Sequence, residues 1–357
     1  MTPTSGGGKA FDAAPLFDPS EGITVRSPLQ SGAGWWAGAP GANYDPRGNT
    51  FYLVYRQRQP RELGRGVECR IAASDNGVAF SDIWALPKTS FDAISLERCS
   101  LMRGFDGRWR LYISYVSPQD NQWRIAMMEA DEPDRFDPTT LDVIMTAEST
   151  GTEGVKDPNV FAIGPMFYML VSYATTLTDL GDEYQGKKHA TGDIYNTGLT
   201  LSRTAAAISS DGRRFRWIGD VSPIHGTDRI VTDGKKGRGG EGESGGGGEQ
   251  ERDARWDAYC RRIGSLLPLN AGGYLALYDG SASVTENYEE RTGIAITYDL
   301  RTYWSLSNYG PAVVSPHGTR SLRYVDVLSV GHELFYYYEM CLPDSSHELR
   351  VSVVERN

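Results

Sequence analysis

The feature that most constrains the fold of this 357-residue chain is a hairpin pattern that occurs five times. The copy at Val155–Tyr173 has a short apolar run, a turn at Gly164-Pro165 and a second run rich in aromatic and β-branched residues. Two such runs around a turn predict a β-hairpin, and apolar strands are typical of strands buried on both faces. Each copy ends in a tyrosine, namely Tyr55, Tyr115, Tyr173, Tyr278 and Tyr338.

A second pattern follows each of the first four hairpins. It is an alternating strand, an acidic turn and an aromatic residue, and it begins at Ile71, Ile125, Ala207 and Ile294. The fifth hairpin is followed only by the strand pattern of Glu348–Val354. Each repeat thus supplies four strands, which is the content of one propeller blade. Because no stretch of helical periodicity separates the strands, we expect an all-β fold, a single five-bladed β-propeller with four-stranded antiparallel blades.

The spacing of the repeats also indicates the domain organisation. The closing tyrosines are about 60 residues apart, except for about 105 residues between the third and fourth. Two insertions explain the excess, Thr175–Gly198 and a Gly/Glu-rich segment at about 233–252. We expect the second insertion to be disordered because it lacks apolar residues to bury. Residues 1–22 are expected to be a flexible N-terminal arm, and residues 23–357 the catalytic propeller domain.

Charge and composition disfavour several classes of partner. The formal net charge of −10 argues against nucleic acid or an anionic membrane surface. No apolar run approaches the roughly 18 residues that span a bilayer, and no secretory signal is visible, so we expect a cytoplasmic protein. The four cysteines form no CxxC pair and the five histidines show no metal-ligand spacing. Buried free thiols are therefore expected, and neither a metal nor another cofactor is.

The repeats place candidate functional residues on one ring. In a propeller the first strand of each blade lines a central channel, so the starts of these strands gather at one end. If the closing tyrosines are in register, the starts are Ala39, Glu97, Asp157, Arg262 and Leu322–Arg323. We predict that Glu97 and Asp157 are catalytic carboxylates. The predicted substrate-binding residues around them are Trp35, Trp36, Arg98, Lys156, Arg262, Asp279 and Arg323.

Such a ring suits cleavage of a glycosidic bond. This reaction needs one carboxylic acid to protonate the leaving oxygen and usually a second carboxylate as base or nucleophile. Two carboxylates in one funnel repel each other, which raises the pKa of one of them. Neighbouring arginines would bind an anionic group of the substrate, or phosphate as a co-substrate, and tryptophans would stack on a sugar ring. The structural alternative is that Glu97 closes the channel in a salt bridge with Arg262 or Arg323.

The pattern resembles the five-bladed propeller glycosidases, that is, the relatives of arabinanases and xylosidases, of invertases, and of mannoside phosphorylases and hydrolases. Lys156-Asp157-Pro158 is similar to the Asp-Pro start that these families use for catalytic or pKa-setting aspartates. Trp256–Gly264 and Gly273–Gly280 resemble the fourth blade of the mannoside phosphorylase group, and Ala39–Ala42 its first. The resemblance covers about residues 30–354. It implies a glycoside hydrolase of a small-molecule or oligosaccharide substrate, with phosphorolysis as the alternative to hydrolysis.

Two departures keep the roles of the carboxylates open. Ala39 stands where arabinanases and invertases have an essential aspartate, so Asp45, six residues later, is a third catalytic candidate if the register differs. Glu97-Arg98 stands where the phosphorylase group has Glu-Asp. We expect Glu97 as the general acid and Asp157 as base or pKa-setting partner, or the reverse.

Two other functions remain as alternatives. One is a non-catalytic carbohydrate-binding or scaffold propeller. The other, weaker alternative is a sialidase-like enzyme, because Ser74–Gly77 and Ser210–Gly212 look like the Asp-box turns of sialidase propellers. A sialidase would also need three arginines at one carboxylate-sized site.

Overall fold

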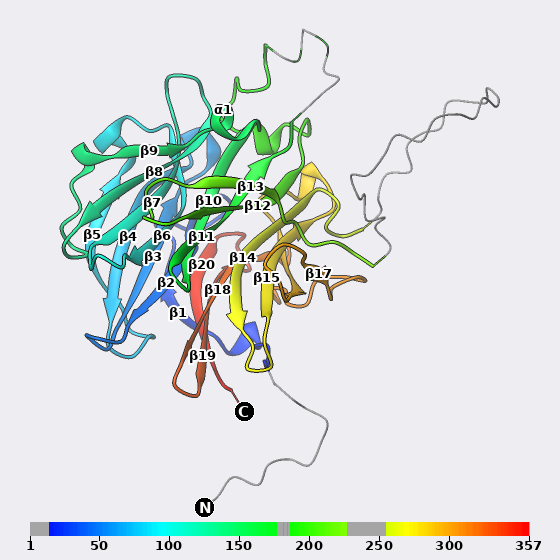
Figure 1. Ribbon diagram of the computed structural model, residues 1–357. Helices are drawn as coiled ribbons and strands as arrows, with labels where there is room; N and C mark the ends of the chain where they lie inside the picture. Colours follow the sequence, from blue (N-terminus) through cyan, green and yellow to red (C-terminus); the bar gives the residue numbers. More distant parts are fainter. Residues whose placement is uncertain (1–13, 177–180, 182–183, 185, 227–254, 357) are drawn as a thin grey trace, which may run out of the picture.

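The computed structural model describes residues 14–176, 181, 184, 186–226 and 255–356. The regular secondary structure of this part of the chain is mostly antiparallel β-strand, as the sequence predicts (Figure 1). Its helical segments are short: the α-helix α1 (Ala147–Thr150) and the 3-10 turns η1 (Pro19–Glu21), η2 (Arg61–Leu63), η3 (Lys88–Phe91), η4 (Pro138–Thr140), η5 (Ile194–Asn196) and η6 (Val284–Glu286). Within the described ranges, no helix has the length and apolar character to cross a membrane.

The strands form antiparallel groups of four in which neighbours along the chain pair. Group one is β2 (Trp36–Asp45), β3 (Thr50–Arg58), β4 (Gly66–Ser74) and β5 (Ser81–Pro87). Group two is β6 (Ser95–Arg103), β7 (Trp109–Val116), β8 (Trp123–Ala130) and β9 (Asp142–Met145). Group three is β10 (Gly154–Ile163), β11 (Met166–Ala174), β12 (Ser202–Ser209) and β13 (Arg216–Asp220). Group four is β14 (Cys260–Pro268), β15 (Tyr274–Ser281), β16 (Arg291–Thr297) and β17 (Trp304–Ser305).

Group five joins the two ends of the chain. It consists of β18 (Leu322–Val330), β19 (Glu333–Cys341) and β20 (His347–Glu355), and its fourth strand is β1 (Ile23–Arg26) from the N-terminal side. Ile23 lies opposite Val351, and Figure 1 shows the blue N-terminal strands beside the red C-terminal ones. The sequence patterns predict all five hairpins, but they leave this fourth strand unassigned because β1 is only four residues long.

The first strands of the five groups contact one another around a common centre. β2 contacts β6 and β18, β6 contacts β10, and β14 contacts β18. Between β10 and β14, the side-chain amide of Asn159 donates a hydrogen bond to the carbonyl of Gly264. We call these five strands the central ring.

The hydrophobic core is divided into clusters that lie between successive groups. Residues of groups one and two form one cluster around Val54 and Trp109, and groups two and three form another around Ile125 and Met169. Similar clusters join groups three and four, four and five, and five and one. All four cysteines are buried and free, which confirms the sequence expectation. Packing therefore holds the groups face to face, while hydrogen bonds hold the strands within each group.

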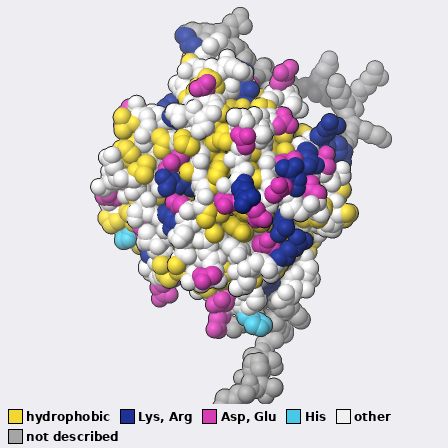
Figure 2. Space-filling view, turned by 90° about the vertical axis from the view of Figure 1, so that its left-hand side faces the viewer, with side chains coloured by type: hydrophobic (Ala, Val, Ile, Leu, Met, Phe, Trp, Pro, Cys, Tyr) yellow, Lys and Arg dark blue, Asp and Glu magenta, His cyan; other side chains and the backbone are white. Residues whose placement is uncertain are grey.

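The surface carries charges of both signs. On the face in Figure 2, lysine and arginine side chains lie beside aspartates and glutamates, and apolar side chains show between them. The basic side chains on this face are therefore accompanied by acidic ones.

The N-terminal segment differs from its predicted form. Residues 1–13 lie outside the described part of the chain, but η1 and Phe17 pack against group five. The Phe17 ring lies 4.6 Å from that of Tyr338 and 4.8 Å from that of Tyr336, centre to centre. The hydroxyl of Tyr336 also donates to the carbonyl of Pro15. The packed domain thus begins before residue 23. The predicted disordered insertion at 233–252 lies outside the described residues.

We predict that Phe17→Ala lowers the free energy of unfolding by about 3 kcal/mol, because it removes a buried aromatic side chain from the group-five cluster. Urea denaturation followed by tryptophan fluorescence measures this change. Tyr309→Ala is the matched control, since Tyr309 is fully exposed and its loss should change stability by less than about 0.5 kcal/mol. Equal stability of the two variants would show that the segment before β1 does not contribute to the core.

Candidate functional site

A backbone irregularity marks the start of every strand in the central ring. In β2, β6, β10 and β18, two residues lie opposite a single residue of the neighbouring strand, and β14 has one extra residue, Gly264. Such β-bulges redirect side chains and are common next to active sites. The bulged pairs begin at Ala39, Glu97, Asp157 and Tyr324. Three of the five starts predicted from the sequence thus lie at a bulge, and those in β14 and β18 are one or two residues early.

Three of the bulge residues have strained backbones. Ala39, Asp157 and Tyr324 adopt φ angles of 50°, 56° and 54°, in the left-handed region that residues with a Cβ rarely occupy. Strain of this kind costs free energy and often accompanies a functional site. The same conformation at equivalent points of three groups indicates that the ring requires it.

Buried charges surround the bulges in an alternating series that we call the charge belt. Arg56 of β3 pairs with Glu97 and, at 3.1 Å, with Glu339 of β19. Arg323 of β18 lies 2.8 Å from Glu339 and 2.7 Å from Glu290. The belt therefore runs through groups two, one, five, four and three in the order Glu97, Arg56, Glu339, Arg323, Glu290, Arg262 and Asp157.

The cations of the belt determine the ionisation of its glutamates. Burial alone would raise the pKa of Glu97, but Arg56, Lys156 and Arg58 outweigh it and lower that pKa. Burial likewise opposes ionisation of Glu290, yet Arg262 and Arg323 lower its pKa to about 2. Glu97 is therefore an anion at neutral pH. This direction disfavours the general-acid role predicted for Glu97 and suits a base or an electrostatic partner.

Asp157 and Asp279 face the same small cavity. It has a volume of about 10 Å³, which is room for about one water molecule, and its lining includes Arg262 and Tyr324. Arg262 lies 3.6 Å from Asp157 and 3.2 Å from Asp279, so the two carboxylates share one guanidinium. Among the described residues, none forms a hydrogen bond with Oδ1 of Asp157. The carboxylate of Asp279 thus lies beside that of Asp157, and one oxygen of Asp157 accepts no hydrogen bond from the described residues.

Asp279 differs from Glu290 in its proton affinity. Burial raises the pKa of Asp279 to about 6, against the opposing charge of Arg262 and with help from Glu290. Its Oδ1 accepts a hydrogen bond of 2.8 Å from the backbone N–H of Tyr324. The sequence places Asp279 among the substrate-binding residues, and the structure places it directly beside Asp157.

Arg98 is a structural bridge across the central ring. Its guanidinium donates to the carbonyls of Pro40 at 2.8 Å and Gly264 at 2.6 Å, and it lies 3.2 Å from Asp326. This one side chain of group two thereby contacts groups one, four and five, and it is almost fully buried. With its donors engaged by the protein, Arg98 does not fit the predicted role in substrate binding.

The other predicted residues fall into two places. Lys156 lies with Asp157, 3.5 Å away, and over the ring of Tyr195. Trp36 is buried in a stack with His347 and under the guanidiniums of Arg58 and Arg323, so it packs against protein groups. Trp35, next to it, is partly exposed.

Asp45 lies away from the other two candidate carboxylates. It is the last residue of β2, six residues beyond the bulge at Ala39, and it pairs with Arg103 at 2.8 Å. Six residues of strand span about 20 Å. The structure thus does not bring Asp45 together with Glu97 and Asp157.

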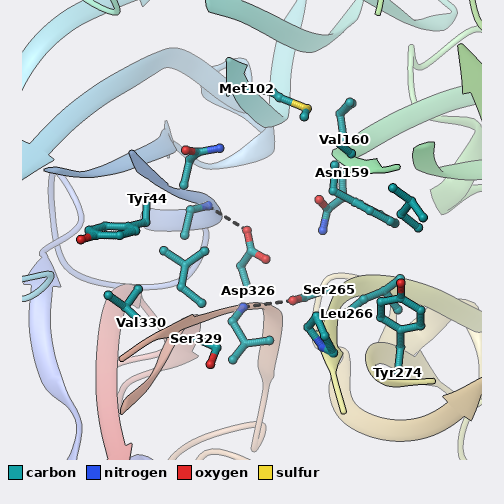
Figure 3. A pocket seen from close by; sticks show the side chains of 18 residues that line it. Tyr44, Met102, Asn159, Val160, Ser265, Leu266, Tyr274, Asp326, Ser329 and Val330 are labelled. Carbon is teal, nitrogen blue, oxygen red and sulfur yellow. Dashed lines mark hydrogen bonds between the residues drawn. The ribbon is translucent and has the colours of Figure 1, made fainter. Parts of the chain in front are cut away.

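A larger cavity opens at the other end of the central ring. Its volume is about 440 Å³, and Figure 3 shows polar side chains from four groups around it, with Asp326 near its centre. Asp326 accepts a hydrogen bond from the N–H of Ala42, and burial raises its pKa. Because Arg98 lines the small cavity and its partner Asp326 lines the large one, this pair separates them. None of the predicted site residues lines the larger cavity.

The sequence patterns missed several members of the site. Tyr324 escaped notice because the closing tyrosines are not all equivalent: Tyr338 faces a bulge, whereas Tyr115 pairs with Leu96 and Tyr173 with Val155. Glu339 carried a usable signal, since a charge that follows five apolar or aromatic residues in strand β19 indicates a buried partner. Glu290 lies just before strand β16, where a charged residue usually reaches solvent. No local sequence pattern therefore indicates that it is buried.

Comparison with known proteins gives results for structure only. No family model matches the sequence, and no curated protein does. Among solved structures, the RS223 β-xylosidase matches with a TM-score of 0.58 and 11% identity over 90% of this chain and 93% of its own. A GH43_1 enzyme from Xanthomonas citri, complexed with xylotriose, gives 0.58 and 11% over 93% and 90%. The β-1,2-mannobiose phosphorylase from Listeria innocua gives 0.54 and 15% over 93% and 94%.

These matches confirm the resemblance that the sequence indicates. The chain has a β-propeller-like, nearly all-β fold similar to those of glycoside hydrolases and a phosphorylase relative. At 11–15% identity the likeness concerns the fold, and it assigns no catalytic residue to this chain.

We predict that Arg98→Met lowers the free energy of unfolding by about 3 kcal/mol or more, because it leaves Asp326 buried without its partner. Chemical denaturation measures the change. In the double variant Arg98→Met/Asp326→Asn, part of the loss should be recovered. Arg108→Met is the control, since Arg108 and its partner Asp131 are exposed and such pairs contribute less than about 1 kcal/mol. If the losses of stability in Arg98→Met and in Asp326→Asn simply add up in the double variant, the two side chains are not coupled.

A second prediction concerns the pH dependence of stability. The pKa of Asp279 is raised from 3.8 to about 6, so between these values the folded protein holds a proton that the unfolded chain releases. The free energy of unfolding should therefore fall as pH rises through this window, by an amount on the order of 2–3 kcal/mol. Asp279→Asn should lack this decline, and the exposed-site variant Asp131→Asn should retain it. Identical pH profiles for Asp279→Asn and the unmodified protein, from urea denaturation at pH 4–7, would contradict the assignment.

Proposed function

We propose that this protein is a carbohydrate-active enzyme. It would hydrolyse a glycosidic bond at the bulges near the beginnings of the five first strands. We also infer that the five groups are the five blades of one propeller around that ring. The blade assignment is supported by the contacts between four successive pairs of first strands, by the Asn159–Gly264 hydrogen bond between β10 and β14, and by the five clusters between successive groups. The fold shared with xylosidases and a mannobiose phosphorylase supports the class of reaction.

The observation that carries the proposal is the pairing of Asp157 with Asp279. Glycosidases need one carboxyl group that holds a proton and one that does not. Asp279 has a pKa raised to about 6, so a substantial fraction is protonated just below neutral pH. Asp157 lies beside the same guanidinium, on a strained bulge, with a free acceptor oxygen. We therefore assign proton donation to Asp279 and the base or nucleophile role to Asp157.

Glu97 acts at a distance from this pair in our proposal. It is ionised and paired with Arg56, and its negative charge also acts on Lys156 and Tyr324 beside Asp157. In this position it would help to balance positive charge in a transition state that resembles an oxocarbenium ion.

The charge balance favours a neutral sugar over an anionic one. Arg262 already lies near Asp157, Asp279 and Glu290, and Arg323 lies between Glu290 and Glu339. An additional anion would have to compete with these buried carboxylates. For the same reason we favour water over phosphate as the attacking group.

Substrate binding requires the small cavity to open. Its volume of about 10 Å³ does not admit a sugar. The 3.6 Å contact between Arg262 and Asp157 is beyond hydrogen-bond distance, whereas Arg262 holds Glu290 at 2.9 Å. We propose that, when a substrate enters, the Arg262 side chain moves away from Asp157 and retains its ion pair with Glu290.

The first test of the function measures hydrolysis on a panel of aryl glycosides and neutral oligosaccharides, with and without phosphate. On any substrate cleaved, Asp157→Asn and Asp279→Asn should each lower kcat by about 100-fold or more, the contribution expected of acid–base groups. Because Asp279 must be protonated, kcat/KM should also fall as pH rises through about 6. Asp131→Asn, an exposed aspartate, should match the unmodified enzyme. Full activity of both ring variants would exclude this catalytic pair.

A second candidate function is a non-catalytic carbohydrate-binding propeller. The larger cavity favours it, since about 440 Å³ accommodates a small oligosaccharide and its lining offers amides, hydroxyls and aromatic rings at Asn43, Asn159, Ser265, Tyr44 and Tyr274. This function predicts sugar binding without turnover, weakened by Tyr274→Ala and unaffected by Asp157→Asn. Calorimetric titration with the same panel distinguishes the two candidates.

A further inference from the structure

Three residues from groups four and five form a cluster at the ends of strands. Cys341 ends β19, His347 begins β20, and Glu289 precedes β16. One potential metal-ligand atom from each of the three lies within 4.8 Å of the other two. Cys341 and His347 are direct partners across the β19–β20 hairpin, so the backbone itself fixes this pair.

The imidazole of His347 is oriented as in known metal sites. Its Nδ1 lies 2.8 Å from Oε1 of Glu339, which fixes the ring, and the ring stacks on Trp36 at 4.5 Å. Metal-binding histidines almost always use their second nitrogen in this way, with a carboxylate partner. Glu339 is itself held by Arg56 and Arg323, so its position is determined by the charge belt.

The second nitrogen of His347 faces Glu289 of the same cluster. Nε2 is fully buried, and among the described residues none completes a regular hydrogen bond to it. Oε2 of Glu289 lies 3.4 Å away, and Sγ of Cys341 belongs to the same cluster. A buried polar atom without a hydrogen bond is costly, and it lies where a bound cation would complete its bonding.

The set of donor atoms favours zinc. A thiolate, an imidazole and a carboxylate are borderline ligands that suit Zn²⁺, and three protein ligands with a free fourth position are typical of non-structural zinc sites. Ligand atoms about 2.0–2.3 Å from a tetrahedral zinc are about 3.3–3.6 Å apart, so separations within the cluster would shorten by about 1.5 Å at most. The charges of the thiolate and Glu289 would balance that of the ion.

The cluster is accessible from one side. The side chain of Glu289 is 26% exposed, whereas those of Cys341 and His347 are buried. Thr319 donates a hydrogen bond to the same oxygen of Glu289, and Gly318 lies so close to Cys341 that a Cβ there would be 2.8 Å from Sγ. The loop before β18 thus borders the cluster, and an ion would enter from the side of the partly exposed Glu289.

We propose that Glu289, Cys341 and His347 bind one zinc ion, with the fourth coordination position open to water. This site is separate from the Asp157–Asp279 pair and does not depend on the proposed hydrolysis. Sequence spacing does not indicate it, because Glu289 comes from a different group than the other two ligands.

The test measures zinc binding to the full chain after treatment with a chelator. Zinc is added alone, the protein is desalted, and metal content is determined by mass spectrometry, while competition with a chromophoric chelator gives the affinity. We expect one zinc per chain, and with Co²⁺ a thiolate charge-transfer band. Cys341→Ser and Glu289→Gln should each weaken binding at least tenfold, and Cys341→Ser should abolish the band.

Two control variants separate this site from other residues of the same type. Cys99→Ser replaces a buried thiol in another hydrophobic cluster, and His332→Gln replaces an exposed histidine in a turn. Both variants should therefore bind zinc like the unmodified protein. Glu289→Gln alters a partly exposed side chain, and it decides the question if Cys341→Ser fails to fold. Absence of zinc binding, which is expected if His347 merely forms ion pairs with both glutamates, would overturn the proposal. Zinc retained by Cys341→Ser and Glu289→Gln would do so as well.

Discussion

The series of buried ion pairs at the centre of the molecule is the interaction on which the rest of the structure depends. Taking a charge out of water is expensive unless its partner is well placed, so each member of the charge belt requires the next. The belt passes through all five groups, and its order is set by which groups are neighbours in space. Hydrophobic clusters hold the groups together in pairs, but the belt and Arg98 fix all five relative to a single centre.

The same charges limit what chemistry the centre can perform. Most carboxylates there are held ionised by arginines, as with Glu290, and such groups do not donate protons. Asp279 and Asp326 differ, because burial outweighs their contacts with arginines and raises their pKa. Of these two, Asp279 is the one that lines the small cavity with Asp157. A structural network and a catalytic pair can therefore share residues, provided that one carboxyl group is buried more effectively than it is neutralised. This is the physical basis for assigning different roles to Asp157 and Asp279.

The two cavities show how one side chain divides the centre into two environments. Arg98 and Asp326 separate a narrow, highly charged space from a wider one with amides, hydroxyls and aromatic rings. At the rim, Glu339 connects the belt to His347 and so to the proposed zinc site. Changes in the belt should therefore reach the orientation of that imidazole.

The sequence by itself determined the strands, because alternating apolar residues and glycine-containing turns act locally and each repeat carries its own copy. It also placed Glu97 and Asp157 at the starts of first strands, since a hairpin of fixed length puts its first residue at a fixed position. That these starts are β-bulges is known from the structure. Only the tertiary structure decided the partners. Arg98 of group two meets Asp326 of group five, and Glu289 of group four meets Cys341 and His347 of group five. Tyr324 was missed because a shift of one or two residues between tyrosine and bulge is invisible without the pairing register. The closure by β1 and the proton affinity of Asp279 likewise depend on burial between groups, and no local pattern encodes burial between groups.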